Sequence, residues 1–201
     1  MHVLRIAMAL SLQNFVFAIF AIIPIFEANS INSEHHPHDH HHHHGLKSLH
    51  FTLFDQETVN KTAFTIVNGV AGAGLSELAS PFGTLFVLND PLTVTANSSS
   101  KVVGTSEALT ITSSLDGLQG ISVAKFTLNL KNHKGSISVV GVTHNLNPSD
   151  HPIVGGTGDF LFVQGYITTS PVSFSGLNVI FKIEFHVYWP PYATSAHKGN
   201  N

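Results

Sequence analysis

The octapeptide FKIEFHVY, residues 181–188, decides the fold class because its apolar and polar side chains alternate. Successive side chains of an extended strand point to opposite faces, so a period of two predicts a strand with one buried and one exposed face. The heptapeptide KFTLNLK, residues 125–131, repeats the pattern. Segments of this kind favour β-strands over helices.

Similar segments follow one another from residue 49 onward, separated by Gly, Asn, Asp, Ser and Pro. We predict eight strands, at residues 49–55, 63–68, 83–88, 107–113, 122–130, 135–142, 160–169 and 179–189. No segment shows a sustained helical period with caps. The pattern indicates an all-β barrel or sandwich, and closure into a barrel would remove the exposed edges that apolar strands otherwise present. An eight-stranded antiparallel β-barrel is just wide enough to hold one small ligand.

The stretch HPIVGGTGDFLFVQGY, residues 151–166, places three glycines within four positions. A phosphate-binding loop is excluded, because its pattern ends in Gly-Lys-Ser/Thr and opens a helix, whereas here Asp159 follows the last glycine and a strand is expected next. We therefore predict a structural turn between two strands, formed by Gly155, Gly156, Thr157 and Gly158.

The composition narrows the classes of function. The chain has 201 residues, of which 43% are hydrophobic and 10% charged, and its formal net charge is −3. No basic surface for nucleic acid is expected from such a balance. The absence of cysteine excludes disulfides, thiol catalysis and cysteine-ligated metal sites. No Ser-His-Asp order or paired-carboxylate motif points to a classical hydrolase.

Residues 1–28 carry the features of an export signal. Arg5 precedes an apolar run over residues 6–26, which predicts a secretory signal peptide, with a retained membrane anchor as the alternative. Sequons at Asn60 and Asn97 provide N-glycosylation acceptors if the chain enters the secretory pathway.

A polar linker is predicted at residues 29–48, and its composition indicates disorder. It contains a histidine tract made of His35, His36, His38, His40, His41, His42, His43 and His44. Weak metal binding by imidazoles and a solvated spacer or inserted tag are the two interpretations. No other histidine cluster in the sequence indicates a fixed metal site. A flexible tail is predicted at residues 193–201, which leaves one domain at residues 49–192.

Four motifs in residues 49–189 resemble, in order and spacing, those of the plant dirigent protein family. They are FTLFD at 51–55, FGTLFVLNDPLT at 82–93, SKVVG at 100–104 and PIVGGTGDFLFVQGY at 152–166. The resemblance implies an eight-stranded antiparallel barrel of the dirigent and allene-oxide-cyclase type. It also implies a homo-oligomer, trimer or dimer, that is secreted to the apoplast or cell wall.

The resemblance further implies a function. Dirigent proteins direct the stereoselective coupling of phenoxy radicals from monolignols such as coniferyl alcohol, toward lignan-type or lignin-type products. A separate laccase or peroxidase makes the radicals, so the implied partners are phenolic radicals or quinone methides and no cofactor is expected. A non-catalytic cell-wall scaffold or phenolic-binding protein on the same barrel is the alternative.

Two aspartates match family motifs. Asp55 matches the pocket aspartate at the end of the first strand, which implies a proton donor or a hydrogen-bond partner for a phenol. A surface residue that begins a turn is the alternative interpretation. Asp90 precedes Pro91 in the second motif, where capping a turn is the expected role.

The chain departs from the family pattern where lignan-directing members carry an arginine and a pocket tyrosine. Thr105 and Thr110 stand in these places, and Arg5 is the only arginine in the chain. His144 and Asp150 are the candidate polar substitutes for the missing groups. The candidates for lining the pocket are Phe51, Thr110, Phe126, Phe162 and Tyr166, of which strand alternation turns about half inward.

Overall fold

A computed structural model describes residues 47–70 and 79–196 of the chain. The predicted signal peptide, its membrane-anchor alternative and the histidine tract lie outside the described residues. Within these residues, no helix has the length and apolar character needed to cross a membrane.

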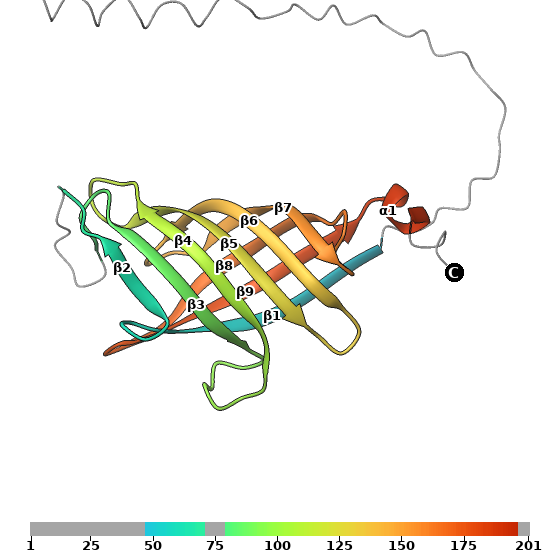
Figure 1. The fold of residues 1–201 in the computed structure, drawn as a ribbon, viewed down its shortest axis with the longest axis horizontal. Coiled ribbons are helices and arrows are strands. Elements are labelled where there is room, and N and C mark those ends of the chain that lie inside the picture. The colour runs from blue at the N-terminus through green and yellow to red at the C-terminus, as the bar shows by residue number, and fades with distance from the viewer. Residues whose placement is uncertain (1–46, 71–78, 197–201) are drawn as a thin grey trace, which may run out of the picture. The chain divides into compact units, whose positions relative to one another are not determined.

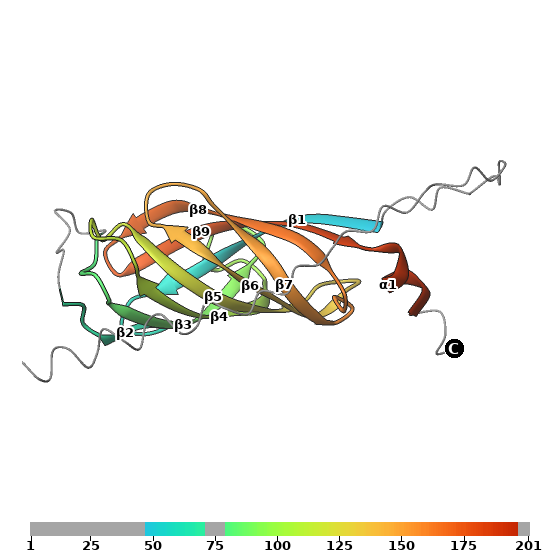
Figure 2. The same cartoon turned by 90° about the horizontal axis from the view of Figure 1, so that it is seen from above.

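The described residues form nine β-strands and one short helix (Figure 1). The strands are β1 (Lys47–Thr58), β2 (Ala63–Val67), β3 (Leu85–Thr93), β4 (Val102–Thr112), β5 (Gln119–Asn129), β6 (Lys134–His144), β7 (Ser149–Gly158), β8 (Gln164–Ser175) and β9 (Asn178–Trp189), followed by α1 (Pro191–Ala196). From β3 to β9 every strand pairs antiparallel with the next, and β9 pairs with β1. The pairing of β1 with β3 closes eight of the strands into a ring, and Figure 2 shows the strands wrapping around a common axis. The predicted eight-stranded antiparallel barrel is confirmed.

Strand β2 is not part of the ring. It pairs with the same edge of β3 as β1 does, at a different part of that edge. Phe54 and Asp55 of β1 pair with β3, and from there β1 continues along β9 as far as Thr58. β2 takes over the rest of the β3 edge, beginning with Ala63 opposite Leu88. The barrel wall therefore forks immediately after Asp55.

The interior of the barrel has a packed half and a hollow half. Burial alternates along the whole of β5, as the period of two predicts. In the packed half, the ring of Phe185 stacks on Phe51 at 4.4 Å and meets the edge of Phe126 at 5.4 Å. The buried Trp189 closes the end of this core. Toward the other end of the same strands, the inward side chains line a cavity.

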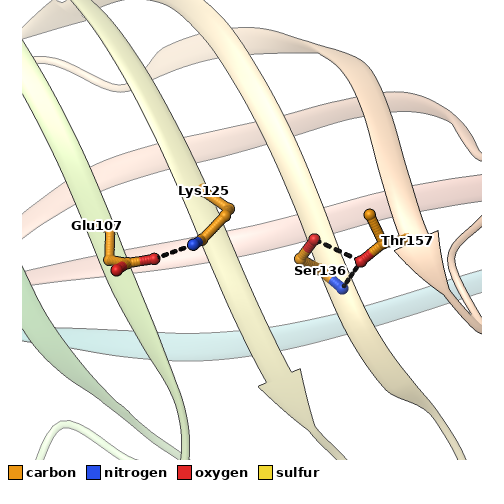
Figure 3. Close-up of polar contacts among 4 residues, drawn as sticks. All are labelled: Glu107, Lys125, Ser136 and Thr157. Atoms are coloured by element: carbon orange, nitrogen blue, oxygen red, sulfur yellow. Dashed lines mark hydrogen bonds and ion pairs between the residues drawn. The ribbon is translucent and has the colours of Figure 1, made fainter.

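Strand β7 was missed by the prediction, and the glycine-rich turn was placed too early. Gly155, Gly156 and Thr157 lie inside β7 and pair with β6, and Thr157 accepts a hydrogen bond from the amide of Ser136 at 3.1 Å (Figure 3). Gly158, with φ 61°, is where the chain turns. Glycine lowers strand propensity, so the sequence pattern did not reveal β7. Its partner β6 is also distant along the chain: Thr157 pairs with Ser136, 21 residues away.

The segment that follows Gly158 is a turn and not the start of the predicted strand. The turn covers residues 159–163, and β8 begins at Gln164. The turn contains apolar residues because the side chains of Phe160 and Val163 are buried in the core. The carboxylate of Asp159 accepts the amide of Lys134 at 2.7 Å and holds the turn against β6.

The C-terminal end of the domain also differs from the prediction. Helix α1 occupies residues of the predicted tail as far as Ala196, and Ala193 is buried against the core. Residues 197–201 lie outside the described part.

Candidate functional site

The hollow half of the barrel contains a cavity of about 300 Å³. Its walls come from the inward positions of all nine described strands, because alternate residues of each strand face the axis. Apolar side chains dominate the walls; among them are Phe86, Leu88, Ala108, Phe126, Phe181 and Ile183. Small apolar pockets with a few polar groups are typical of ligand sites.

Three carboxyl groups gather where the barrel wall forks. Asp55 and Glu57 occupy alternate positions of β1 and both line the cavity. Asp90 lies on β3, two residues from the register partner of Asp55, and is completely buried. The buried Ser106 is the register partner of Asp90 on β4. The four side chains form what we call the carboxyl cluster.

Burial raises the pKa of all three carboxyl groups. It raises the pKa of Asp90 to about 6 and, together with the charge of Asp90, that of Glu57 to about 7. The pKa of Asp55 lies well above its ordinary value, first because of burial and then because of the charge of Asp90. Hydrogen bonding by Ser106 opposes the shift of Asp55 only in part. Burial therefore favours the neutral form of Asp55 and leaves Glu57 about half protonated at pH 7, whereas Asp90, with its lower pKa, is mostly ionised there.

Hydrogen bonding does little to hold these groups ionised. Among the described residues, Oδ1 of Asp55 and both carboxylate oxygens of Asp90 accept no hydrogen bond. The side chain of Thr62 opposes the shift of Asp90 without reaching hydrogen-bond geometry. No Lys or Arg is found among the described residues that line the cavity. An ion pair that would keep a carboxylate charged is thus missing from this lining.

A row of hydroxyl groups crosses the cavity wall. The side chain of Thr110 on β4 hydrogen bonds with Ser122 on β5 at 2.8 Å, and Ser122 bonds with Thr143 on β6 at 2.8 Å. All three line the cavity. The hydroxyl group of Thr110 forms one end of this row. A ligand that carries hydroxyl groups finds both donors and acceptors here.

His151 of β7 adds a neutral imidazole to the lining. Its exposed fraction is 2%, and its Nε2 lies 3.1 Å from the hydroxyl oxygen of Thr169. Burial lowers its pKa, which the charge of Asp150 opposes. Nδ1 is buried with no hydrogen-bond partner in the described part of the chain. The ring fits because Gly141 faces it: a Cβ at this position would lie 2.8 Å from Nδ1.

The structure brings Asp55, Thr110 and Phe126 together in the cavity lining, as the sequence analysis expects for pocket residues. Phe51 does not line the cavity, because its ring is stacked on Phe185 in the packed half. Asp55 is buried, so its alternative interpretation as a surface turn residue is wrong.

Four other candidates lie outside the cavity lining. The ring of His144 accepts the amide of Leu146 at 3.0 Å and shapes the loop after β6. Asp150 accepts the hydroxyl of Thr168 at 2.6 Å. Phe162 is 47% exposed in the turn before β8.

Tyr166 is the fourth, and it stacks on His186 with 43% of its surface exposed. Its position in β8 turns it to the outer face, since the adjacent Ile167 is the residue that lines the cavity.

Sequence reasoning missed Glu57, Ser106 and His151 and misread Asp90. Asp90 does not cap a turn; it lies inside β3 with Pro91 paired to Thr105 of β4. The period of two held the signal, because Leu88, Asp90 and Leu92 occupy one face of a strand. An aspartate before a proline resembles a turn start, and that local signal concealed the pattern.

Comparison with known proteins decides the family. A family profile described as "Dirigent-like protein" matches residues 48–189. The chain belongs to the dirigent family. Proteins of this family are typically secreted.

Several dirigent proteins of known sequence are similar to the chain. A dirigent protein from Sinopodophyllum hexandrum is 34% identical over 131 residues, which cover 64% of this chain and 67% of that protein. Pterocarpan synthase 1 from Glycyrrhiza echinata is 33% identical over 122 residues, 59% of this chain and 63% of that one. The chain thus spans about two thirds of the length of these relatives.

The fold is shared with dirigent structures. A solved pterocarpan synthase dirigent protein superposes with a TM-score of 0.63 at 23% identity, covering 71% of this chain and 96% of that one. A second structure of this kind gives a TM-score of 0.62, also at 23% identity. The carboxyl cluster therefore lies in a barrel that has the fold of these dirigent structures.

Proposed function

We propose that this dirigent protein binds a phenolic coupling intermediate in its cavity and directs the stereochemistry of bond formation. The intermediate is a phenoxy radical or the quinone methide that follows from it, and a separate laccase or peroxidase supplies the oxidising step. The observation that carries the proposal is the buried carboxyl cluster beside a mainly apolar cavity, where burial raises the pKa of Asp55 well above its ordinary value and that of Glu57 to about 7.

Orientation is the first contribution of the cavity. Apolar walls accept an aromatic ring, and the hydroxyl row hydrogen bonds with phenol or alcohol groups, so one face of the intermediate is presented to its reaction partner. A difference of about 1.4 kcal/mol between the two faces gives roughly tenfold stereoselectivity. Such a difference is within the reach of a single hydrogen bond.

Proton transfer is the second contribution. The carboxylic acid of Asp55, which lines the cavity, donates its proton to the carbonyl oxygen of the quinone methide, which becomes a phenol. A hydroxyl group adds to the methide carbon with its oxygen lone pair and returns its own proton to the carboxylate. Atoms and charge balance, and the acid is regenerated. No Lys or Arg among the described residues that line the cavity opposes the neutral form of Asp55.

The size of the cavity favours one bound molecule. About 300 Å³ lies at the small end of ligand pockets. Relatives at about one third identity are named pterocarpan synthases. We therefore propose that the acid-assisted addition takes place within a single bound quinone methide. In radical coupling, the cavity holds the first radical and thereby determines which face the second radical can approach.

The test is a coupling assay with matched variants. The mature protein is mixed with coniferyl alcohol and a one-electron oxidant, and the products are separated by chiral chromatography. We expect an enantiomeric excess that falls at least about tenfold in Asp55→Asn, because asparagine cannot donate a carboxylic proton. Asp150→Asn, outside the cavity, is the control and keeps the excess.

A racemic product from the unmodified protein contradicts direction of this monolignol. A panel of other phenols and of preformed quinone methides then separates the remaining cases. Binding without stereoselectivity on every member of the panel would assign the chain to the alternative function, a phenolic-binding scaffold of the cell wall.

We also propose that the chain is secreted to the apoplast as a glycoprotein. Asn60 is exposed in the turn after β1, and Asn97 is exposed in the loop after β3. Both acceptors are accessible on the folded domain, which supports modification at the two sequons.

A further inference from the structure

Two histidines that are far apart in the sequence meet on the outer face of the barrel. His50 lies on β1 and His186 on β9, 136 positions along the chain, and they are direct register partners. Their inward neighbours Phe51 and Phe185 pack in the core, so the two imidazoles point away from the cavity. The two Nδ1 atoms lie 3.1 Å apart.

Both rings are held in place by their surroundings. The ring of His186 is stacked on Tyr166 of β8, with centroids 4.6 Å apart and planes 17° apart. The two imidazoles meet at 67°, with centroids 5.2 Å apart. Side chains whose orientation is set before binding lose less entropy when a ligand joins them.

The spacing of the nitrogens suits a shared metal ion. Imidazole nitrogens bind divalent transition metals at about 2.0–2.1 Å, which separates two ligands by about 2.9 Å at a right angle and about 3.3 Å at the tetrahedral angle. The observed 3.1 Å lies between these values. Without metal, the Nδ1–H group of one ring donates a hydrogen bond to Nδ1 of the other ring. Moving this proton to Nε2 of the donor ring frees both Nδ1 lone pairs, with no net release of protons.

We propose that His50 and His186 form a bidentate site for a divalent transition-metal ion on the outside of the barrel. Affinity follows the order Cu²⁺ above Ni²⁺ and Zn²⁺, as for other imidazole sites. The described residues supply no third His, Asp, Glu or Cys ligand to such a group. Water therefore completes the coordination, and the ion exchanges readily.

The site is independent of the cavity and of the histidine tract. It lies on the face of β1 and β9 opposite to the carboxyl cluster, so it does not rest on the proposed function. The tract also carries imidazoles, and its contribution has to be removed before the pair is measured.

The test uses the full chain in which the eight tract histidines are replaced by asparagine. Ni²⁺ alone is titrated into this parent by calorimetry, and one ion per chain is expected. His50→Asn and His186→Asn should each weaken binding at least about tenfold, since even outer-shell partners of a metal contribute that much. His144→Asn is the matched control: it removes another histidine and leaves the affinity unchanged.

A second measurement identifies the ligands. The electron paramagnetic resonance spectrum of the parent with one equivalent of Cu²⁺ should show coupling to two imidazole nitrogens, and to one in each pair variant. Circular dichroism checks that the variants keep their β-structure. No saturable Ni²⁺ binding by the parent, equal affinity in the pair variants, or a Cu²⁺ spectrum without nitrogen coupling overturns the proposal.

Discussion

At the scale of single residues, Asp90 has unfavourable surroundings for a charge. It is fully buried, and within the described chain neither of its oxygens accepts a hydrogen bond. Ionising such a group raises the free energy of the folded state relative to the unfolded state, where the carboxylate is hydrated, and so lowers the free energy of unfolding. The carboxyl cluster is therefore a source of instability at high pH as well as a source of protons.

Asp90→Asn should stabilise the protein at pH 8 and leave its stability at pH 4 almost unchanged. The folded pKa, about 6, lies above the ordinary value of 3.8, so stability is fully present below about pH 4 and is lost as the pH rises through 6. Removing the charge recovers of the order of 3 kcal/mol in the free energy of unfolding at pH 8. Denaturant titrations at both pH values measure the effect.

The control for this prediction is Asp116→Asn. Asp116 is on the surface, and hydrogen bonds from Ser114 and Leu118 lower its pKa, so its ionised form is the stable one. The substitution should bring no gain at pH 8. An equal gain in both variants would contradict the assignment to burial, because net charge alone would then explain it.

His151 acts with the opposite sign over part of the same range. Burial lowers its pKa, so its contribution to stability is present above the ordinary value of 6.5 and is lost as the pH falls. The stability of the whole chain thus combines two opposed slopes between about pH 4 and 6.5. Comparing the free energy of unfolding of Asp90→Asn with that of the parent at the same pH separates the contribution of Asp90 from that of His151.

At the scale of elements, strand β7 shows what its glycines do. A Cβ at Gly156 would lie 2.2 Å from the carbonyl oxygen of Phe160, because the turn after β7 folds back against the strand. A Cβ at Gly155 would meet no atom of the described residues within 4 Å. The neighbouring glycines therefore have different roles: one allows a close approach of backbone, and the other is exchangeable.

Gly156→Ala should lower the free energy of unfolding by about 1–3 kcal/mol, since the backbone has to shift to admit the methyl group. Gly155→Ala is the matched control and should change it by less than about 1 kcal/mol, with a small gain from the less flexible unfolded chain. Denaturation midpoints under identical conditions measure both. Equal losses at the two positions would mean that β7 needs glycine for its backbone conformation.

At the scale of the whole molecule, the outer face of β3 to β6 carries an apolar patch. Cross-strand register aligns Val87, Leu109, Val123 and Val140 in one row, each 36–51% exposed. The next row contains Leu85, Ile111, Ile121 and Val142. We propose that this patch pairs with further copies of the chain, as a trimer or dimer, because the apolar rows of one copy match those of another.

Leu109→Lys should shift the assembly to monomers in sedimentation velocity, with a dissociation constant raised at least about tenfold, since a buried unpaired charge opposes association. Val154→Lys on β7, where the side chain is 62% exposed outside the two rows, should leave the assembly unchanged. A monomeric parent protein at micromolar concentration would contradict the proposal.

The sequence determined the strands that carry a clear period of two and the all-β class. The count of eight had a compensating error, because it included β2 and lacked β7. Local patterns record which side chains alternate, and that is enough to separate strands from helices. They do not record which strand edges meet, so the fork at Asp55 was out of reach.

The tertiary structure determined most of the site. Asp55 was predicted from its motif, whereas the proximity of Asp90 to Asp55 follows only from the pairing of β3 with β1. His50 and His186 are isolated in the sequence and adjacent in the barrel. Barrel closure brings together residues that are distant along the chain, and both burial and the distances between charged or metal-binding groups follow from that closure. The chemistry of this protein therefore depends on contacts that no local pattern contains.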